Sequence, residues 1–158
     1  MRSPSEDPYT DAVMRHFRNP RHRRPVPPGE ALAEENNPLC GDRIRVTLRL
    51  ADGVVRGLEY DICGCALSTA SASMMSCILN GKTPAEVRRL TALFQRLVAG
   101  GEISGKERSE LGEVVAFQQI RSYPVRRKCA LLPWRALEKA LATLDRPAGR
   151  GSSKEAGG

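Results

Sequence analysis

The sequence predicts a mixed α and β domain in which one antiparallel hairpin precedes a series of helices. Two observations support this fold class. Apolar and polar residues alternate along residues 43–50, the pattern of a strand with one buried face, and a tight-turn signal follows. From residue 66 onward, apolar residues recur at helical spacing instead. The chain has 158 residues, a length that suits one domain with its own core.

The composition narrows the class of protein. Hydrophobic residues make up 41% of the chain and charged residues 27%, as in ordinary soluble globular proteins. No stretch approaches the roughly 18 to 20 apolar residues that a membrane helix needs. Residues 1–9 also lack the apolar core of a secretory signal. We therefore expect a cytoplasmic protein with no membrane partner.

The net charge of +7 is concentrated in two segments, residues 15–24 and residues 121–128. A solvated basic face is the simplest interpretation of both. The functional alternatives are docking onto an acidic protein surface or onto nucleic acid. The first segment also holds His16 and His22, which we interpret as surface or interface residues rather than metal ligands.

A short helix and a long loop are predicted before the hairpin. Residues 8–18 carry apolar positions at helical spacing, and Asn19 ends this helix because a residue before proline avoids the helical region. Residues 20–38 are rich in proline and charge, so we expect an extended loop there.

The hairpin is the clearest local signal in the chain. Asp52 and Gly53 form a strong tight-turn pair, and a second strand is expected at about residues 54–62. The predicted buried face of the first strand consists of its alternating apolar residues, Ile44, Val46, Leu48 and Leu50.

Two helices with clear limits follow the hairpin. Residues 66–80 have a helical pattern, and Gly81 supplies a typical C-terminal stop. The residues from Thr83 to Glu86 resemble a capping box with proline at the first helical position. The helix that they begin is expected to run to about Ala99, before a pair of glycines.

The last third of the chain has weaker signals. We expect a polar loop over residues 102–108 and a helix or helical turn over residues 109–120. Pro124 can begin a helical turn that carries Cys129, and Pro133 can open a separate final helix in which Trp134 is a core residue. The domain is expected to span residues 1–145, and the Gly- and Ser-rich residues 146–158 are expected to form a disordered tail.

Three cysteines and one aspartate are candidate metal ligands. Gly41 lets the chain turn so that the thiolate of Cys40 and the carboxylate of Asp42 can converge on one ion. Cys65 precedes a helix, whose free N–H groups favour a thiolate, and Cys129 follows three cations that do the same. Together the four could complete a tetrahedral shell for zinc or iron, although each alone is compatible with a structural role.

Three segments of the chain resemble one known family. Residues 37–42 (NPLCGD), residues 64–73 (GCALSTASAS) and residues 124–130 (PVRRKCA) are similar, in order, to motifs of the iron–sulfur cluster assembly family that contains SufU, IscU and the N-terminal domain of NifU. The likeness extends over about residues 8–145, and coincidence in all three motifs is improbable.

The resemblance implies an α+β fold, with a small antiparallel sheet of about three strands packed against several helices. The predicted hairpin supplies two of these strands. The third strand is expected in residues 29–36 or after Asn36, but its position cannot be located from the pattern. The resemblance also implies that four side chains converge at one exposed end of the domain: Cys40, Asp42, Cys65 and Cys129.

Two features favour the SufU branch of the family. Members similar to IscU carry histidine immediately before the third cysteine, where this chain has Lys128, and residues 100–109 resemble an extra segment of SufU-like members. For that branch the resemblance implies a zinc ion bound by the four converging side chains. It also implies sulfur transfer from a SufS-type cysteine desulfurase, so that the chain would act as a zinc-dependent sulfurtransferase.

The resemblance further assigns roles to the cysteines. Cys129 is the expected sulfur acceptor, with Cys65 and Cys40 as a possible sulfur relay. A partner that takes over one metal position would free a thiolate to attack the persulfide, which is ordinary thiol–disulfide exchange. Downstream cluster assembly proteins would then be further partners.

Other functions compete with this interpretation. A scaffold similar to IscU would bind iron or a transient iron–sulfur cluster on the same side chains. A zinc-stabilised nucleic-acid-binding module would use the basic segments, but the chain has no repeated paired-cysteine finger and no run of aromatic residues for base stacking, so nucleic acid is not an expected partner. A purely structural or redox-sensing domain is the third alternative.

Two positions depart from the family pattern or stand outside it. Ile62 occupies a place where the family usually has glycine, and Cys63 lies two residues before Cys65. Cys63 could be a fifth sulfur ligand, a resolving thiol or a strand residue, and we favour the strand residue. Cys77 shares the apolar face of its predicted helix, so we expect it in the core.

Overall fold

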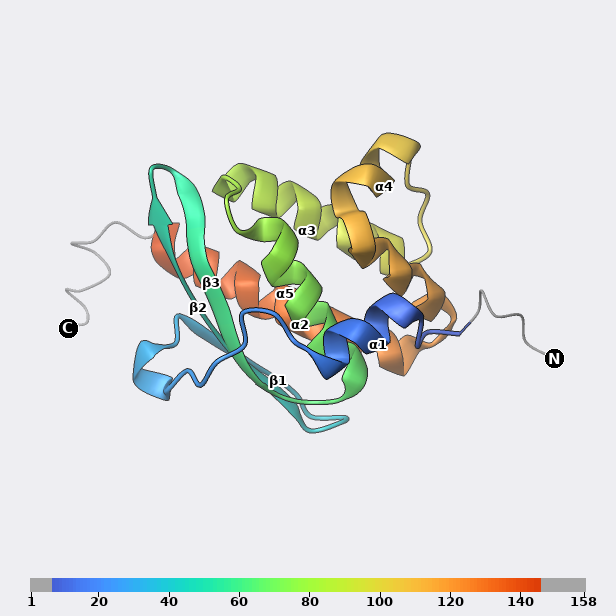
Figure 1. The fold of residues 1–158 in the computed structure, drawn as a ribbon, viewed down its shortest axis with the longest axis horizontal. Helices are drawn as coiled ribbons and strands as arrows, with labels where there is room; N and C mark the ends of the chain where they lie inside the picture. The colour runs from blue at the N-terminus through green and yellow to red at the C-terminus, as the bar shows by residue number, and fades with distance from the viewer. Residues whose placement is uncertain (1–6, 146–158) are drawn as a thin grey trace.

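A three-stranded antiparallel sheet with helices packed against it forms the framework of the structure (Figure 1). The computed structural model describes residues 7–145. The strands run in the order β1 (Ala33–Asn37), β2 (Asp42–Ala51) and β3 (Val54–Cys63) across the sheet. The predicted α+β fold is therefore confirmed, and β1 is the third strand that the sequence pattern did not locate.

The hairpin of β2 and β3 forms as predicted. Asp52 and Gly53 both have positive φ angles, 56° and 77°, which match the twist of the flanking strands. Burial alternates along β2 from Asp42 to Leu48, so Asp42 lies on the face that points toward the core. The pairing shifts between Thr47 and Arg49, and Leu50 beyond this bulge is exposed. The prediction that Leu50 faces the core is wrong for this reason.

Helices cover one face of the sheet and stack on one another (Figure 1). Contacts from α2 reach β3, contacts from α5 reach β1 and β2, and α1 packs against α2. The helical elements are α1 (Asp11–Arg18), η2 (Pro28–Glu30), α2 (Ala66–Leu79), α3 (Pro84–Val98), α4 (Gly105–Leu111), η3 (Gly112–Ser122) and α5 (Pro124–Asp145).

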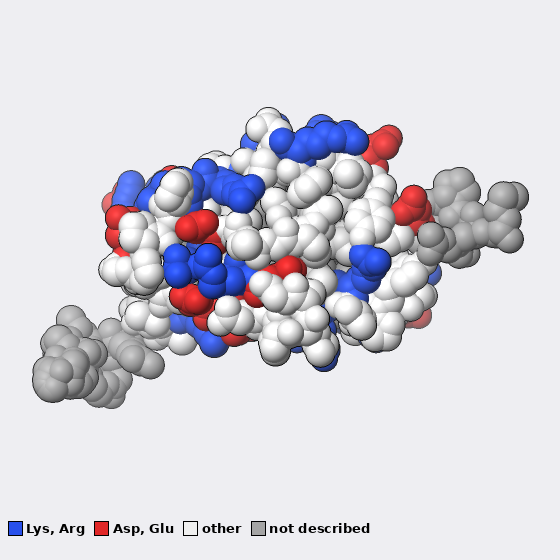
Figure 2. Space-filling view, turned by 90° about the horizontal axis from the view of Figure 1, so that it is seen from below, with Lys and Arg blue, Asp and Glu red and all other residues white. Residues whose placement is uncertain are grey.

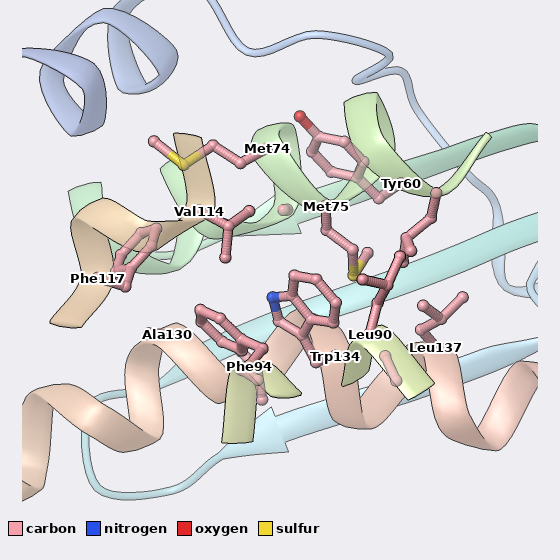
Figure 3. Close-up of a cluster of buried hydrophobic side chains, with 14 of the residues drawn as sticks. Tyr60, Met74, Met75, Leu90, Phe94, Val114, Phe117, Ala130, Trp134 and Leu137 are labelled. Carbon is pink, nitrogen blue, oxygen red and sulfur yellow. The ribbon is translucent and has the colours of Figure 1, made fainter. Parts of the chain in front are cut away.

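The core lies between α2, α3, α5 and the sheet (Figure 3). Trp134 is fully buried and stacks on Phe94 with ring centroids 4.6 Å apart, while Phe117 meets Phe94 edge-on at 5.8 Å. Such aromatic pairs add to the stabilisation from buried area. The prediction that Trp134 is a core residue is confirmed.

Several predicted boundaries need correction. The loop predicted over residues 20–38 contains η2 and β1, because β1 pairs with the hairpin rather than displaying a local strand signal. The loop predicted over residues 102–108 contains the start of α4, where Ser104 and Glu107 form a capping box. Residues 112–122 form a 3-10 helix. The predicted disordered tail, residues 146–158, lies outside the described residues.

The last helix is longer than the sequence predicts. Residues 124–145 form one helix, α5, with Pro133 inside it rather than at a new start. Pro133 is buried together with its neighbours Leu132 and Trp134. Packing of the flanking turns against the core therefore compensates for the hydrogen bond that proline cannot make. Within the described residues, no helix is long and apolar enough to cross a membrane.

Candidate metal centre

A tight loop between β1 and β2 presents Cys40. The carbonyl of Asn37 accepts hydrogen bonds from the N–H groups of Cys40 (3.2 Å) and Gly41 (2.8 Å). The Oδ1 atom of Asn37 also accepts from the N–H of Leu39 at 3.1 Å. Gly41 has a φ of 75°, a conformation that other residues rarely adopt. Asn37 thus holds both ends of the loop, and the Cys40 thiol is exposed at its tip.

Asp42 follows this loop as the first residue of β2. Its side chain is only 4% exposed, and its Oδ2 atom is buried without a hydrogen-bond partner among residues 7–145. An ionised carboxylate that is buried and unpaired costs several kcal/mol, so such groups in proteins usually bind a metal or a cation. This orphaned oxygen is the observation that best fits a bound metal ion.

Cys65 lies at the N-terminus of α2. It is the N-cap residue, and its Sγ accepts a hydrogen bond from the N–H of Ser68 at 3.4 Å. Gly64 precedes it in a crowded place: a Cβ atom there would lie 2.4 Å from Ser68 Oγ and 3.0 Å from Asp42 Cγ. Only glycine therefore lets the chain pass between the aspartate and the start of α2.

Cys129 lies in the second turn of α5 and is 5% exposed. Its Sγ is 3.7 Å from the Sγ of Cys40, which lies 89 residues earlier in the chain. The ligand atoms of Cys40, Asp42 and Cys129 all lie within 4.8 Å of one another. Cys65 is not part of that group of three, but it lies near enough to Cys129 for each thiol to shift the pKa of the other. All four predicted side chains thus gather at one end of the sheet.

The proximity of Cys65 and Cys129 shifts the pKa of both thiols. The hydrogen bond from Cys129, assisted by the N–H of Ser68, outweighs burial and lowers the pKa of Cys65 to about 6. The same hydrogen bond, together with burial and the Cys65 and Cys40 charges, raises the pKa of Cys129.

This donor set suits a zinc or iron ion. Thiolates are soft ligands that select these metals, and a carboxylate adds a harder oxygen ligand. The Oδ2 of Asp42 is buried without a hydrogen-bond partner in the described part of the chain, and a carboxylate oxygen of Asp42 lies within 4.8 Å of the thiols of Cys40 and Cys129. The residues present therefore fit a metal of this class.

The rim around the thiols is apolar and basic. Leu39, next to Cys40, is 65% exposed, and Val125 in the first turn of α5 is 58% exposed. The first turn of α5 contains no acidic residue, and three consecutive cations occupy residues 126–128. Arg126 contacts Tyr9 through a hydrogen bond and lies 5.4 Å from the centre of its ring.

The remaining two cysteines, Cys63 and Cys77, are both exposed. Cys63 is exposed as the last residue of β3, opposite Arg43, so the interpretation as a strand residue is confirmed. Cys77 is exposed, and the prediction that it packs in the core is wrong. The helix α2 is buried almost all round, so its apolar stripe does not by itself identify the one exposed position.

The two histidines differ from one another. His22 is exposed, as expected, and accepts or donates a hydrogen bond with Ser76 at 2.9 Å. His16 is buried, so its assignment to the surface is wrong. Its ring nitrogens bond to Ser73 Oγ and Glu113 Oε1, each at 2.7 Å, and this pairing permits burial.

Some of the basic side chains form ion pairs with acidic residues of the same domain. Arg15 pairs with Glu113, and Arg24 pairs with Glu59 and Glu30. Figure 2 shows lysines and arginines interspersed with acidic side chains over the lower face of the molecule. The first basic segment thus forms a mixed surface rather than a uniform one.

Sequence reasoning missed the residues that support the thiols. Asn37, Gly64 and Ser68 belong to the motif segments, so their positions were visible, but their contacts depend on pairing between distant elements. Tyr9, which contacts Arg126, had no local signal at all. These residues act on the site through hydrogen bonds and close approach.

Comparison with known proteins gives a consistent picture. Residues 8–130 match the family described as the NifU-like N-terminal domain. The chain is 37% identical to the zinc-dependent sulfurtransferase SufU of Bacillus subtilis, over 85% of this chain and 89% of the relative. It is 34% identical to the iron–sulfur cluster assembly scaffold protein IscU of Streptococcus pyogenes, over 84% of this chain and 82% of that protein.

Solved structures show the same fold. A putative cluster assembly scaffold protein for the SUF system from Fervidobacterium islandicum superimposes with a TM-score of 0.74 at 26% identity, covering 83% of this chain and 94% of the other. A NifU-like N-terminal protein from Brucella abortus superimposes with a TM-score of 0.76 at 25% identity, covering 89% and 96%.

Proposed function

Because this chain belongs to the NifU-like N-terminal domain family, we propose that it serves iron–sulfur cluster assembly as a SufU-type sulfur acceptor. The sulfur donor in this proposal is a SufS-type cysteine desulfurase. One observation carries the proposal: three thiols gather at one end of the sheet with a buried carboxylate whose Oδ2 has no hydrogen-bond partner among residues 7–145. A purely structural domain has no need of such a group.

The proposal includes a zinc ion. The residues that would hold it are Cys40, Asp42, Cys65 and Cys129, and its charge would keep their thiols ionised and therefore reactive. The relative from Bacillus subtilis is named as zinc-dependent, which supports this choice of metal for the present chain. The buried Asp42 oxygen without a partner supports it independently.

Exposure favours Cys40 as the first thiol that incoming sulfur meets. Cys40 is exposed at a loop tip, whereas Cys129, the acceptor expected from the resemblance, is buried. The Cys40 thiolate attacks the terminal sulfur of the desulfurase persulfide. The sulfur–sulfur bond of the donor breaks, and its cysteine leaves as a thiolate, so the proton stays on the transferred sulfur.

Cys129 can then serve as the second acceptor. Its Sγ lies 3.7 Å from that of Cys40, which is close enough for the same exchange to pass the sulfur inward. Cys65, with its low pKa, would supply a further thiolate beside Cys129. The three cysteines would thereby form a relay from the exposed loop to the buried helix.

The rim around the thiols suits a protein partner. Exposed apolar side chains at Leu39 and Val125 favour burial in an interface, and the cations of residues 126–128 favour an acidic surface. Cations in the first turn of a helix are unfavourable because the dipole is positive there. An acidic desulfurase surface would relieve this cost.

The test combines metal analysis with persulfide mapping. Protein purified without oxygen should contain about one zinc per chain and should stimulate a SufS-type desulfurase. After turnover, mass spectrometry should find the persulfide on Cys40 and, in smaller amount, on Cys129. Zinc-loaded protein that neither stimulates the desulfurase nor carries a persulfide would refute the proposal.

A scaffold that builds a cluster on the same residues is the second candidate. It is favoured by the similarity to a protein named as an IscU scaffold. In that case the purified protein would contain iron and acid-labile sulfide in equal amounts, and it would pass a cluster to downstream assembly proteins. The same metal analysis therefore separates the two functions.

A further inference from the structure

Ser71 lies where α2 meets α5, and its hydroxyl makes two hydrogen bonds to α5. It donates to the carbonyl of Ala130 at 2.6 Å and accepts from the indole Nε1–H of Trp134 at 3.0 Å. Ser71 is 1% exposed, and both bonds are buried. Water therefore cannot replace either bond if the hydroxyl is removed.

The turn of α5 that receives these hydrogen bonds lacks one of its own backbone hydrogen bonds. Pro133 lies within α5 and has no N–H group, so the carbonyl of Cys129 lacks the donor that an uninterrupted helix provides. Ala130, the next residue, is held by Ser71 from outside the helix. The two hydrogen bonds from Ser71 therefore support α5 at the turn that lacks one backbone hydrogen bond, and this turn carries Cys129.

Ser71 is also connected, through its own helix, to a second thiol of the site. Cys65 is the N-cap of α2, the helix that carries Ser71. Trp134 is stacked on Phe94 in the core, which fixes the indole that bonds to Ser71 (Figure 3). Ser71 therefore joins the helix that starts at Cys65 to the helix that carries Cys129.

We propose that Ser71 is a positioning residue for the three thiols of the candidate metal centre. Through Ala130 and Trp134 it holds Cys129 at the separation from Cys65 and Cys40 that lets these side chains bind one metal ion together. The inference rests on the proposed function in so far as it concerns metal affinity. The hydrogen bonds of the Ser71 hydroxyl go to Ala130 and Trp134 rather than to any of the three thiols, so it acts through the placement of α5.

The test compares S71A with S76A. Ser76 is a buried serine of the same helix, and its hydroxyl bonds to Ser73 and to the segment around Arg21 rather than to α5. Zinc affinity is measured by competition with a chromophoric chelator. We expect about tenfold weaker binding for S71A and wild-type binding for S76A and for S71T, which keeps the hydroxyl.

Hydrogen–deuterium exchange supplies a second readout that needs no metal. In S71A the amides around Cys129 should exchange faster, whereas in S76A the change should be confined to the segment near Arg21. If S71A does not fold, W134F takes its place, because it removes the donor that orients the Ser71 hydroxyl.

The outcomes separate the two claims. Equal zinc affinity and equal exchange near Cys129 in S71A and S76A, or in W134F and the wild type, would overturn the role of Ser71. A wild-type protein that binds no zinc would refute the metal in the proposed function, while the exchange measurement would still decide whether Ser71 holds Cys129.

Discussion

At the scale of single residues, Asp42 is the side chain whose environment most needs a ligand. Its buried Oδ2 has no partner among the described residues. We expect D42N to stabilise the metal-free chain by about 1–3 kcal/mol, because it removes a buried unpaired charge. The same variant should lose most of the stabilisation that zinc gives. Thermal unfolding with and without zinc measures both effects.

The matched control for this prediction is D52N. Asp52 is exposed in the β2–β3 turn, where asparagine tolerates the positive φ angle well. Its stability with and without zinc should follow the wild type. A metal-free D42N that is less stable than the wild type would contradict the role assigned to the buried carboxylate.

Cys65 should react as a thiolate in the metal-free chain near neutral pH. The hydrogen bond from Cys129 lowers its pKa to about 6, so the thiolate dominates above that pH and is lost as pH falls through it. Alkylation by iodoacetamide, followed site by site with mass spectrometry, should be half-maximal near pH 6. C129A should move this midpoint upward, and an unchanged midpoint would argue against the influence of Cys129 on the Cys65 pKa.

At the scale of elements, α4 depends on its capping box. Ser104 Oγ accepts from the N–H of Glu107 at 3.1 Å, and Glu107 accepts from the N–H of Ser104 at 3.0 Å. We expect S104A to reduce the free energy of unfolding by about 1 kcal/mol. S109A, at an exposed position of the same helix, should cause no loss. Urea denaturation of the two variants provides the comparison.

The docking of α1 should depend on pH through Glu113. Hydrogen bonds from His16 and then Arg15 lower the pKa of this carboxyl below its ordinary value. Its contribution to stability is therefore present above the unfolded pKa of about 4.3 and is lost as pH falls through the folded value. E113Q should flatten the dependence of unfolding free energy on pH below about pH 4.5.

The control for this pH dependence is E102Q. Glu102 is exposed and makes no ion pair within residues 7–145. Its replacement should leave the acid limb of the stability curve unchanged. An acid limb that is the same in E113Q and the wild type would show that the contact between α1 and η3 does not depend on this charge.

At the scale of the whole molecule, metal binding should couple to folding, because the ligands come from a hairpin loop, a helix start and the last helix. A ligand that binds only the folded state at 100 times its Kd adds about 2.7 kcal/mol of stability. We therefore expect chelators to lower the Tm and zinc to restore it. The Tm of C129A should not respond to chelators or to zinc. A wild-type Tm that stays the same when a chelator is added would contradict the coupling.

Local patterns were sufficient for much of this protein. The alternation along residues 44–48 and the pair Asp52 and Gly53 predict the hairpin because strand and turn preferences act over a few residues. The motif segments likewise indicate which four side chains to look for. Periodicity predicted a hairpin followed by helices, and the resemblance in those segments predicted the three-stranded α+β fold and the family, which are both confirmed.

Contacts between remote segments were needed for the rest. The strand β1 exists because it pairs with β2, Pro133 stays helical because its neighbours are buried, and His16 is buried because Ser73 and Glu113 bond to its ring. The 3.7 Å approach of Cys40 to Cys129 has the same origin. Such features depend on packing energies summed over many residues, which no short window of the chain contains.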